Sequence, residues 1–190
     1  MGRERATLSR RVASFTQSWW AVAVIAALMS VILYQRWQGG HPARPQALRV
    51  GEHLPAIMFE SMEGQPVRIV WETAAGPTVL YAFTPGCTWC KRNTESLRAL
   101  ADGASPQYRF IGVSLAREGL KDYLDTARFK FPVYIAAAER GRLKLSVTPE
   151  TIVVSPNGTI AAVWLGAYRI SNAASIAQHF GFKLPVVESD

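Results

Sequence analysis

Residues 77–90, PTVLYAFTPGCTWC, decide the fold, because a buried strand ends there and a helix begins at a pair of cysteines. Residues 77–83 are almost continuously apolar, as a central strand covered on both faces requires. The Thr-Pro-Gly sequence at residues 84–86 then breaks the strand. Apolar side chains recur at helical spacing over residues 90–101. The stretch therefore predicts a strand, a turn and a helix, with the two cysteines at the junction.

The two cysteines, Cys87 and Cys90, have the spacing of a redox pair. The N–H groups and the dipole of a helix N-terminus favour negative charge, so a cysteine in the first turn is stabilised as a thiolate. The thiolate is the attacking species in disulfide exchange. Three-residue spacing on a helix lets the second sulfur reach the first. We therefore predict that Cys87 attacks, that Cys90 resolves, and that the two form a redox disulfide.

A buried structural pair is the alternative that this spacing leaves open. Two cysteines are too few for a small disulfide-stapled domain. A structural zinc site needs four ligands, and the three histidines are far from the pair in sequence. We expect no metal and no cofactor.

The basic charge of the chain is concentrated at its N-terminus. The chain has 190 residues and a net charge of +7, but residues 1–49 hold seven arginines against one acid. The rest carries 14 basic and 13 acidic side chains, so it has no broad phosphate-binding bias. We expect no nucleic-acid partner. The 49% apolar content suits one folded domain with an appendage.

An apolar run, WWAVAVIAALMSVILY, occupies residues 19–34 and contains one polar side chain, Ser30. Tryptophan and tyrosine bracket it as interfacial anchors do, and residue 37 extends it. We predict a transmembrane signal anchor over residues 19–37, in contact with the lipid bilayer, behind a cytoplasmic basic segment over residues 1–18. A cleaved signal peptide and a buried core helix are the alternatives. The residues behind the run offer no small-x-small cleavage site.

The segment after the run contains two glycines and two prolines within residues 38–46, which indicates a linker. We assign residues 38–49 to the linker and residues 50–190 to the globular domain. With the basic end in the cytoplasm, the domain lies on the periplasmic side. The predicted location is the bacterial inner membrane, crossed once.

The globular part alternates strands and helices, which predicts an α/β fold with a mixed sheet covered on both faces. Asn157-Gly158 is a strong hairpin signal, Ser171 is a suitable helix N-cap, and Gly181 ends that helix. Further strands are expected over 56–60, 67–70, 108–115, 132–136, 151–154 and 159–165, and helices over 118–129, 139–145 and 171–180.

Residues 50–182 resemble the membrane-tethered thioredoxin-like reductases of the TlpA/ResA/CcmG type. The opening VGEHLP, the EGQPV turn, the apolar strand into CTWC, and TPET followed by VVSPNG come in that family's order. The resemblance implies a thioredoxin-like fold with an N-terminal β-hairpin extension. It also implies a cis Thr148–Pro149 bond beside the redox pair. Thr148, Pro149 and Trp89 would then contact the substrate chain, which pairs with the Thr148 backbone.

Three positions depart from the family pattern. Gly86 stands where tryptophan commonly precedes the first cysteine. Tyr81 replaces the buried aspartate of thioredoxins, and Asn93 replaces a glutamate that is frequent in the tethered reductases. The usual proton acceptors for the second thiol are therefore missing, and Glu150, beside Pro149, is the remaining candidate.

The resemblance implies a protein-disulfide oxidoreductase that reduces disulfides of exported proteins with electrons from a membrane thiol donor. Apocytochrome c is one client that the family suggests. The direction would be reversed if the pair were strongly oxidising.

Two other functions are open. The segment TPGCT at residues 84–88 resembles the peroxidatic segment of bacterioferritin-comigratory-type peroxiredoxins, in which Thr84 and an arginine, Arg117 or Arg142, would orient peroxide at Cys87. A copper-binding assembly protein would instead use the two thiolates and His179.

Overall fold

The computed structural model describes residues 19–35, 48–104, 107–136, 141, 143–145 and 147–187. The chain divides into two units, residues 1–44 and residues 45–190. In the first unit, residues 19–35 form a helix with exposed side chains. No helix within the described ranges is long and apolar enough to cross a membrane. The predicted cytoplasmic segment, residues 36 and 37 of the predicted anchor, and residues 38–47 of the predicted linker lie outside these ranges.

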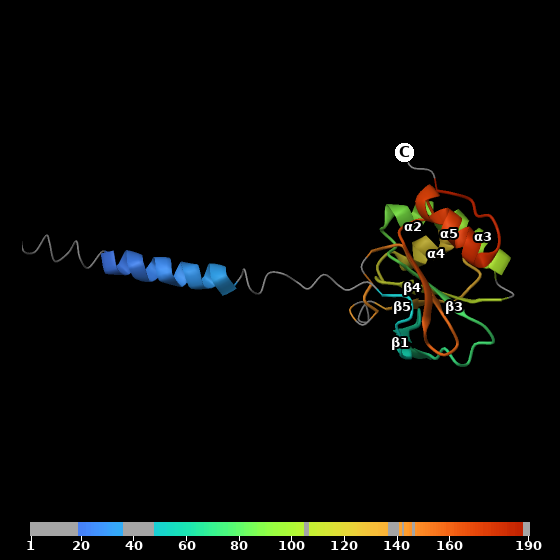
Figure 1. The fold of residues 1–190 in the computed structure, drawn as a ribbon, viewed down its shortest axis with the longest axis horizontal. Helices are drawn as coiled ribbons and strands as arrows, with labels where there is room; N and C mark the ends of the chain where they lie inside the picture. The colour runs from blue at the N-terminus through green and yellow to red at the C-terminus, as the bar shows by residue number, and fades with distance from the viewer. Residues whose placement is uncertain are drawn as a thin grey trace, which may run out of the picture. The chain divides into compact units, whose positions relative to one another are not determined.

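A seven-stranded mixed sheet forms the centre of the described part of the second unit (Figure 1). Its strands are β1 (Ile57–Glu60), β2 (Pro66–Ile69), β3 (Thr78–Phe83), β4 (Arg109–Ser114), β5 (Val133–Ile135), β6 (Glu150–Val154) and β7 (Ile160–Leu165). They lie in the order β2-β1-β5-β4-β3-β6-β7. The strands β3, β4 and β5 are parallel, and the other neighbouring pairs are antiparallel. The predicted mixed sheet is confirmed.

Both predicted hairpins are present. β1 and β2 pair in antiparallel register as the N-terminal extension, and Gly64 in their turn has a φ of +86°. β6 and β7 pair around Asn157 and Gly158, where Gly158 has a φ of +80° and the Asn157 side chain accepts the Thr159 N–H at 3.0 Å. Glycine adopts positive φ without a steric penalty, so these turns form where the sequence indicates.

The described helices of the second unit all cover one face of the sheet. They are α2 (Thr88–Arg92), α3 (Thr94–Ala104), α4 (Leu120–Ala127) and α5 (Ile170–Phe180). Each contributes buried side chains to one core cluster, together with Val79, Tyr81 and Phe83 of β3. The alternate β3 residues, Leu80 and Ala82, face a second cluster to which no described helix contributes. The sheet is covered on both faces, as predicted, but the described helices lie on one face only.

The second face is covered by segments without regular structure. Leu54, Trp71, Leu143 and Leu145 are almost completely buried there, and the Trp71 indole N–H donates to the Leu54 carbonyl at 2.7 Å. The described part of the helical turn expected over residues 139–145 forms turns. On this face of the sheet, the described residues thus provide cover by large apolar side chains on loops and not by helices.

Two local predictions about helices need correction. The helix after the cysteines is divided at Asn93, which is buried and uses its side chain in the core. α5 begins at Ile170 with Arg169 as N-cap, so Ser171 is not the cap. The Arg169 carbonyl accepts the N–H groups of Asn172 and Ala173, which starts the helix without a side-chain cap.

Candidate active site

The first cysteine lies where β3 gives way to α2, as predicted. All six β3 residues are buried, and the chain leaves the sheet through a turn in which the Cys87 N–H donates to the Thr84 carbonyl at 3.0 Å. Cys87 is the N-cap of α2, with extended backbone angles. Its side chain therefore stands at the leading end of the helix, where backbone N–H groups lack partners within the helix.

The Cys87 sulfur has polar contacts with two backbone groups. It accepts the Cys90 backbone N–H at 3.2 Å, and it lies 3.5 Å from the Thr148 carbonyl, to which a protonated thiol donates. The side chain is half-buried, so a client disulfide can approach it. An N–H directed at sulfur stabilises negative charge there, as an attacking thiolate requires.

The second cysteine has a different environment. Cys90 is buried with no exposed surface, and its thiol is free, as is that of Cys87. Burial and the hydrogen bond to the Cys87 side chain together raise the pKa of Cys90 to about 12. The Cys90 carbonyl accepts the Tyr123 hydroxyl at 3.2 Å. The structure therefore brings the two thiols together, one accessible and the other buried and protonated.

The loop before β6 forms the wall opposite Cys87. The Thr148–Pro149 bond is cis, as the family resemblance implied. The hydroxyl groups of Thr84 and Thr148 are 3.1 Å apart, and the Gly166 N–H donates to the Pro149 carbonyl at 2.8 Å. The predicted residues Thr148 and Pro149 are thus brought to the redox pair.

Glu150 is fully buried at the start of β6, but its side chain and Cys90 belong to opposite faces of the sheet. It pairs with Ala82 of β3, and directly paired residues project to the same face. Ala82 belongs to the cluster on the loop-covered face, whereas Cys90 packs in the cluster beneath the helices. This placement does not favour direct proton transfer from Cys90, and the role of Glu150 stays a prediction.

A buried hydrogen-bond network near Cys90 was not found by sequence reasoning. The Asn93 amide donates to the Tyr81 hydroxyl at 3.3 Å, and the Asn93 side-chain oxygen accepts the Tyr168 N–H at 2.8 Å. Burial raises the pKa of Tyr81 well above its usual value, and Cys90 contributes to this increase. Tyr81 and Asn93, two of the three positions that depart from the family pattern, therefore contact each other and form a neutral pair.

A shallow pocket of about 530 Å³ lies beside the turn that precedes Cys87. Thr84, Pro85 and Gly86 line it on one side, and Glu118 and Asp122 contribute acidic groups on the other. Trp89, the remaining predicted contact residue, is 37% exposed on α2. The surface around Cys87 thus offers contacts on several sides.

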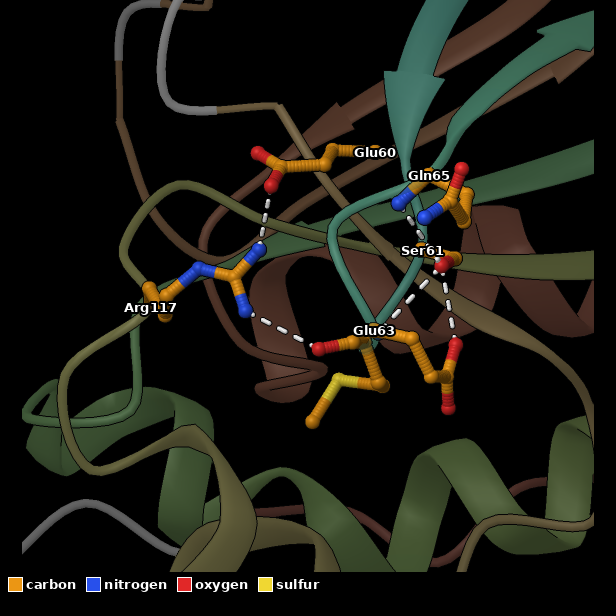
Figure 2. A network of polar contacts seen from close by, with 6 residues as sticks. Glu60, Ser61, Glu63, Gln65 and Arg117 are labelled. Atoms are coloured by element: carbon orange, nitrogen blue, oxygen red, sulfur yellow. Dashed lines mark hydrogen bonds and ion pairs between the residues drawn. The ribbon is translucent and has the colours of Figure 1, made fainter.

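The arrangement does not favour the peroxidase reading. Arg117 lies between the Glu60 carboxylate, at 2.5 Å, and the Met62 carbonyl, at 2.9 Å, and so binds the β1–β2 turn instead of the Cys87 sulfur (Figure 2). The Thr84 hydroxyl contacts Thr148. Arg142 lies outside the described residues.

The described residues do not bring together the ligands that the copper reading requires. Within the described part of the chain, no three metal-binding side chains cluster. His179 lies on α5, and its ring contacts Trp164 and Phe180.

Comparisons by sequence found nothing: no family model matches this chain, and no curated protein matches it. Solved structures share its fold. A thioredoxin domain of a thiol-disulfide oxidoreductase from Bacteroides vulgatus superposes with a TM-score of 0.57 at 19% identity, covering 70% of this chain and 99% of that one. StoA from Bacillus subtilis gives 0.52 at 16%, covering 66% and 99%. Peroxidoxin BcpB from Mycobacterium tuberculosis gives 0.58 at 16%, covering 70% and 96%. The chain has a thioredoxin-like fold.

Proposed function

We propose that this chain is a thiol–disulfide oxidoreductase that reduces disulfides of exported proteins through Cys87 and Cys90. One observation carries the proposal. The half-exposed Cys87 sulfur accepts the Cys90 N–H at the start of a helix, and the buried Cys90 thiol interacts with the Cys87 side chain. An accessible attacking sulfur and a sheltered resolving sulfur are what a dithiol reductase requires.

The reaction has two exchange steps. The Cys87 thiolate attacks one sulfur of the client disulfide, a mixed disulfide forms, and the other client sulfur leaves as a thiolate that takes up a proton. The Cys90 thiol then loses its proton and attacks the Cys87 sulfur. The second client thiol leaves, and the Cys87–Cys90 disulfide remains. Two electrons pass from the protein dithiol to the client.

A membrane thiol donor would restore the dithiol by the reverse exchange, with its own pair oxidised. The family resemblance favours the reducing direction, and apocytochrome c is the client that it suggests. A strongly oxidising pair would run the same steps backwards.

Attachment to the bacterial inner membrane is also part of the proposal. It is supported by the apolar run over residues 19–34 and by the arginines that precede it. The catalytic domain would then lie on the periplasmic side, where disulfides persist in client proteins.

Trapping of the client tests the function. In Cys90→Ala, the mixed disulfide at Cys87 is not resolved, so clients should accumulate as adducts that dithiothreitol releases. The matched control, Cys87→Ala, should trap almost none. Equal trapping by both variants, or no adduct in cells that contain oxidised exported proteins, would contradict the proposal.

A further inference from the structure

Two arginines from different elements stack on the exposed tryptophan beside the redox pair. The guanidinium carbon of Arg92 lies 5.2 Å from the centre of the Trp89 ring, and that of Arg169 lies 5.1 Å from it. Trp89 and Arg92 belong to α2, whereas Arg169 is the N-cap of α5. Cation–π contacts of this kind hold a guanidinium group in place over the ring face.

The stacked groups are suited to bind carboxylates. A guanidinium that lies over a ring keeps N–H donors at its edges, and a carboxylate accepts two of them side by side. Arg169 is exposed and forms no ion pair with the described residues. The first turn of α2 contains no acidic residue.

The arginine–tryptophan patch (Trp89, Arg92 and Arg169) adjoins the wall of the active site. Arg169 follows the turn in which the Gly166 N–H binds the Pro149 carbonyl, so this turn and the cis-proline loop are joined. The pocket beside the turn that precedes Cys87 is lined by Glu118, Asp122 and Lys91. The two acids there are accompanied by a base, whereas the arginine–tryptophan patch contains two bases and no acid.

We propose that the arginine–tryptophan patch binds an acidic segment of the client polypeptide next to the disulfide that Cys87 attacks. This inference rests on the proposed function and names its substrate class. Acidic side chains gain charge-assisted hydrogen bonds from Arg169 and are attracted by the positive charge of Arg92, while basic side chains at the same place are repelled. Clients with aspartate or glutamate beside the reactive cysteine are thus reduced fastest.

Three disulfide peptides test the inference. They share one intramolecular disulfide and carry two glutamates, two glutamines or two lysines beside the same cysteine. The full-length, pre-reduced protein is mixed with each, and the rate constant is divided by that for dithiothreitol with the same peptide, which removes differences in intrinsic reactivity. At low ionic strength the acidic peptide should react about five to ten times faster than the neutral one. This ratio should decrease towards about 1 in 0.5 M salt.

Variants of Arg169 and Arg92 test whether the preference for the acidic peptide arises at the arginine–tryptophan patch. Arg169→Gln should lower the acidic-to-neutral ratio about threefold, and Arg169→Lys should lower it less, since the charge remains while the two-pronged donor is lost. Arg92→Gln gives an independent second measurement. The matched control is Arg68→Gln, an exposed arginine on the edge strand β2, which should leave the ratio unchanged.

The outcomes separate the inference from the proposed function. Equal rates for all three peptides, or an unchanged ratio in both Arg169→Gln and Arg92→Gln, would overturn the inference and leave the reductase intact. If the wild-type protein reduced none of the peptides faster than Cys87→Ala does, the proposed function itself would fail.

Discussion

The surface around Cys87 and the interior around Cys90 differ in charge, although the two sulfurs are three residues apart. The surface carries Arg92 and Arg169 beside Trp89, and it carries Lys91 with the acids Glu118 and Asp122 around the pocket beside the turn before Cys87. All of these charged side chains are exposed to solvent. The interior offers hydrogen bonds from neutral groups, among them Tyr81 and Asn93. In the proposed reaction, the first exchange step would occur where charge can select the client, and the second would occur where charge is disfavoured.

This difference assigns separate tasks to the two thiols. Within the described residues, no hydrogen bond links a carboxylate to the Cys90 thiol, and burial holds the pKa of Cys90 at about 12. The thiolate of Cys90 is therefore scarce at neutral pH. We expect attack by Cys87 to be fast and resolution by Cys90 to limit turnover.

The largest expected effect is the loss of the attacking sulfur. Cys87→Ser should lower the rate of peptide disulfide reduction by about a thousandfold or more, because no other accessible thiol remains. Cys90→Ala should retain the first step, seen as stoichiometric adduct in a mass spectrum. If Cys87→Ser kept a tenth of the wild-type rate, the two thiols would be interchangeable, and the separate roles of Cys87 and Cys90 would be wrong.

The pH dependence of the second step should be the next largest effect. Because burial keeps the pKa of Cys90 well above neutral, its thiolate fraction increases about tenfold per pH unit from neutral to mildly alkaline pH. With an aromatic disulfide reagent that releases a coloured thiolate at each exchange, the slow release should therefore accelerate about a hundredfold between pH 7 and pH 9. A slow phase that did not change with pH would mean that deprotonation of Cys90 is not limiting.

The buried hydrogen-bond network around Asn93 should contribute to the stability of the folded protein. Asn93→Ala leaves the Tyr168 N–H and the Tyr81 hydroxyl without this partner in the core, so the free energy of unfolding should decrease by about 1–3 kcal/mol. Urea denaturation of the reduced protein measures this decrease in the free energy of unfolding. Asn157→Ala, in an exposed turn, is the matched control and should cost less than half as much. If the two variants lost the same free energy of unfolding, the buried network would contribute no more to stability than the exposed turn does.

The smallest effect is expected at Arg117, which joins the β1–β2 turn to the loop before α4. Because this pair is about half exposed, Arg117→Gln should change the rate of disulfide reduction by less than about twofold. Peroxide consumption gives a second readout. A wild-type protein that consumed peroxide with a thiol reductant, and lost this activity in Arg117→Gln, would favour the peroxidase reading instead.

The main strands of the mixed sheet and the position of the two cysteines at the start of a helix could be predicted because their signals are local. Residues 77–83 are apolar at every position, and Asn157-Gly158 fixes a hairpin by turn chemistry alone. The spacing of Cys87 and Cys90 likewise needs only one turn of helix.

The remaining features depend on contacts between distant segments. Tyr81 and Asn93 meet only because α2 ends above β3, and their joint departure from the family pattern was the one available signal. The loop-covered face was not predicted, since Leu54 and Trp71 lie in segments without a regular apolar period. The face on which Glu150 projects follows from strand pairing, which the sequence alone does not specify.

A redox titration of the full-length protein tests the central claim most directly. The protein is equilibrated in buffers of defined dithiothreitol ratio, the free thiols are labelled with a large maleimide, and the products are separated by mass. We predict that Cys87 and Cys90 lose their thiols together, with a two-electron dependence in which a tenfold change in the ratio of oxidised to reduced protein takes about 30 mV. Two thiols that oxidise separately, or that stay reduced in the folded protein under oxidising buffers, would contradict the account.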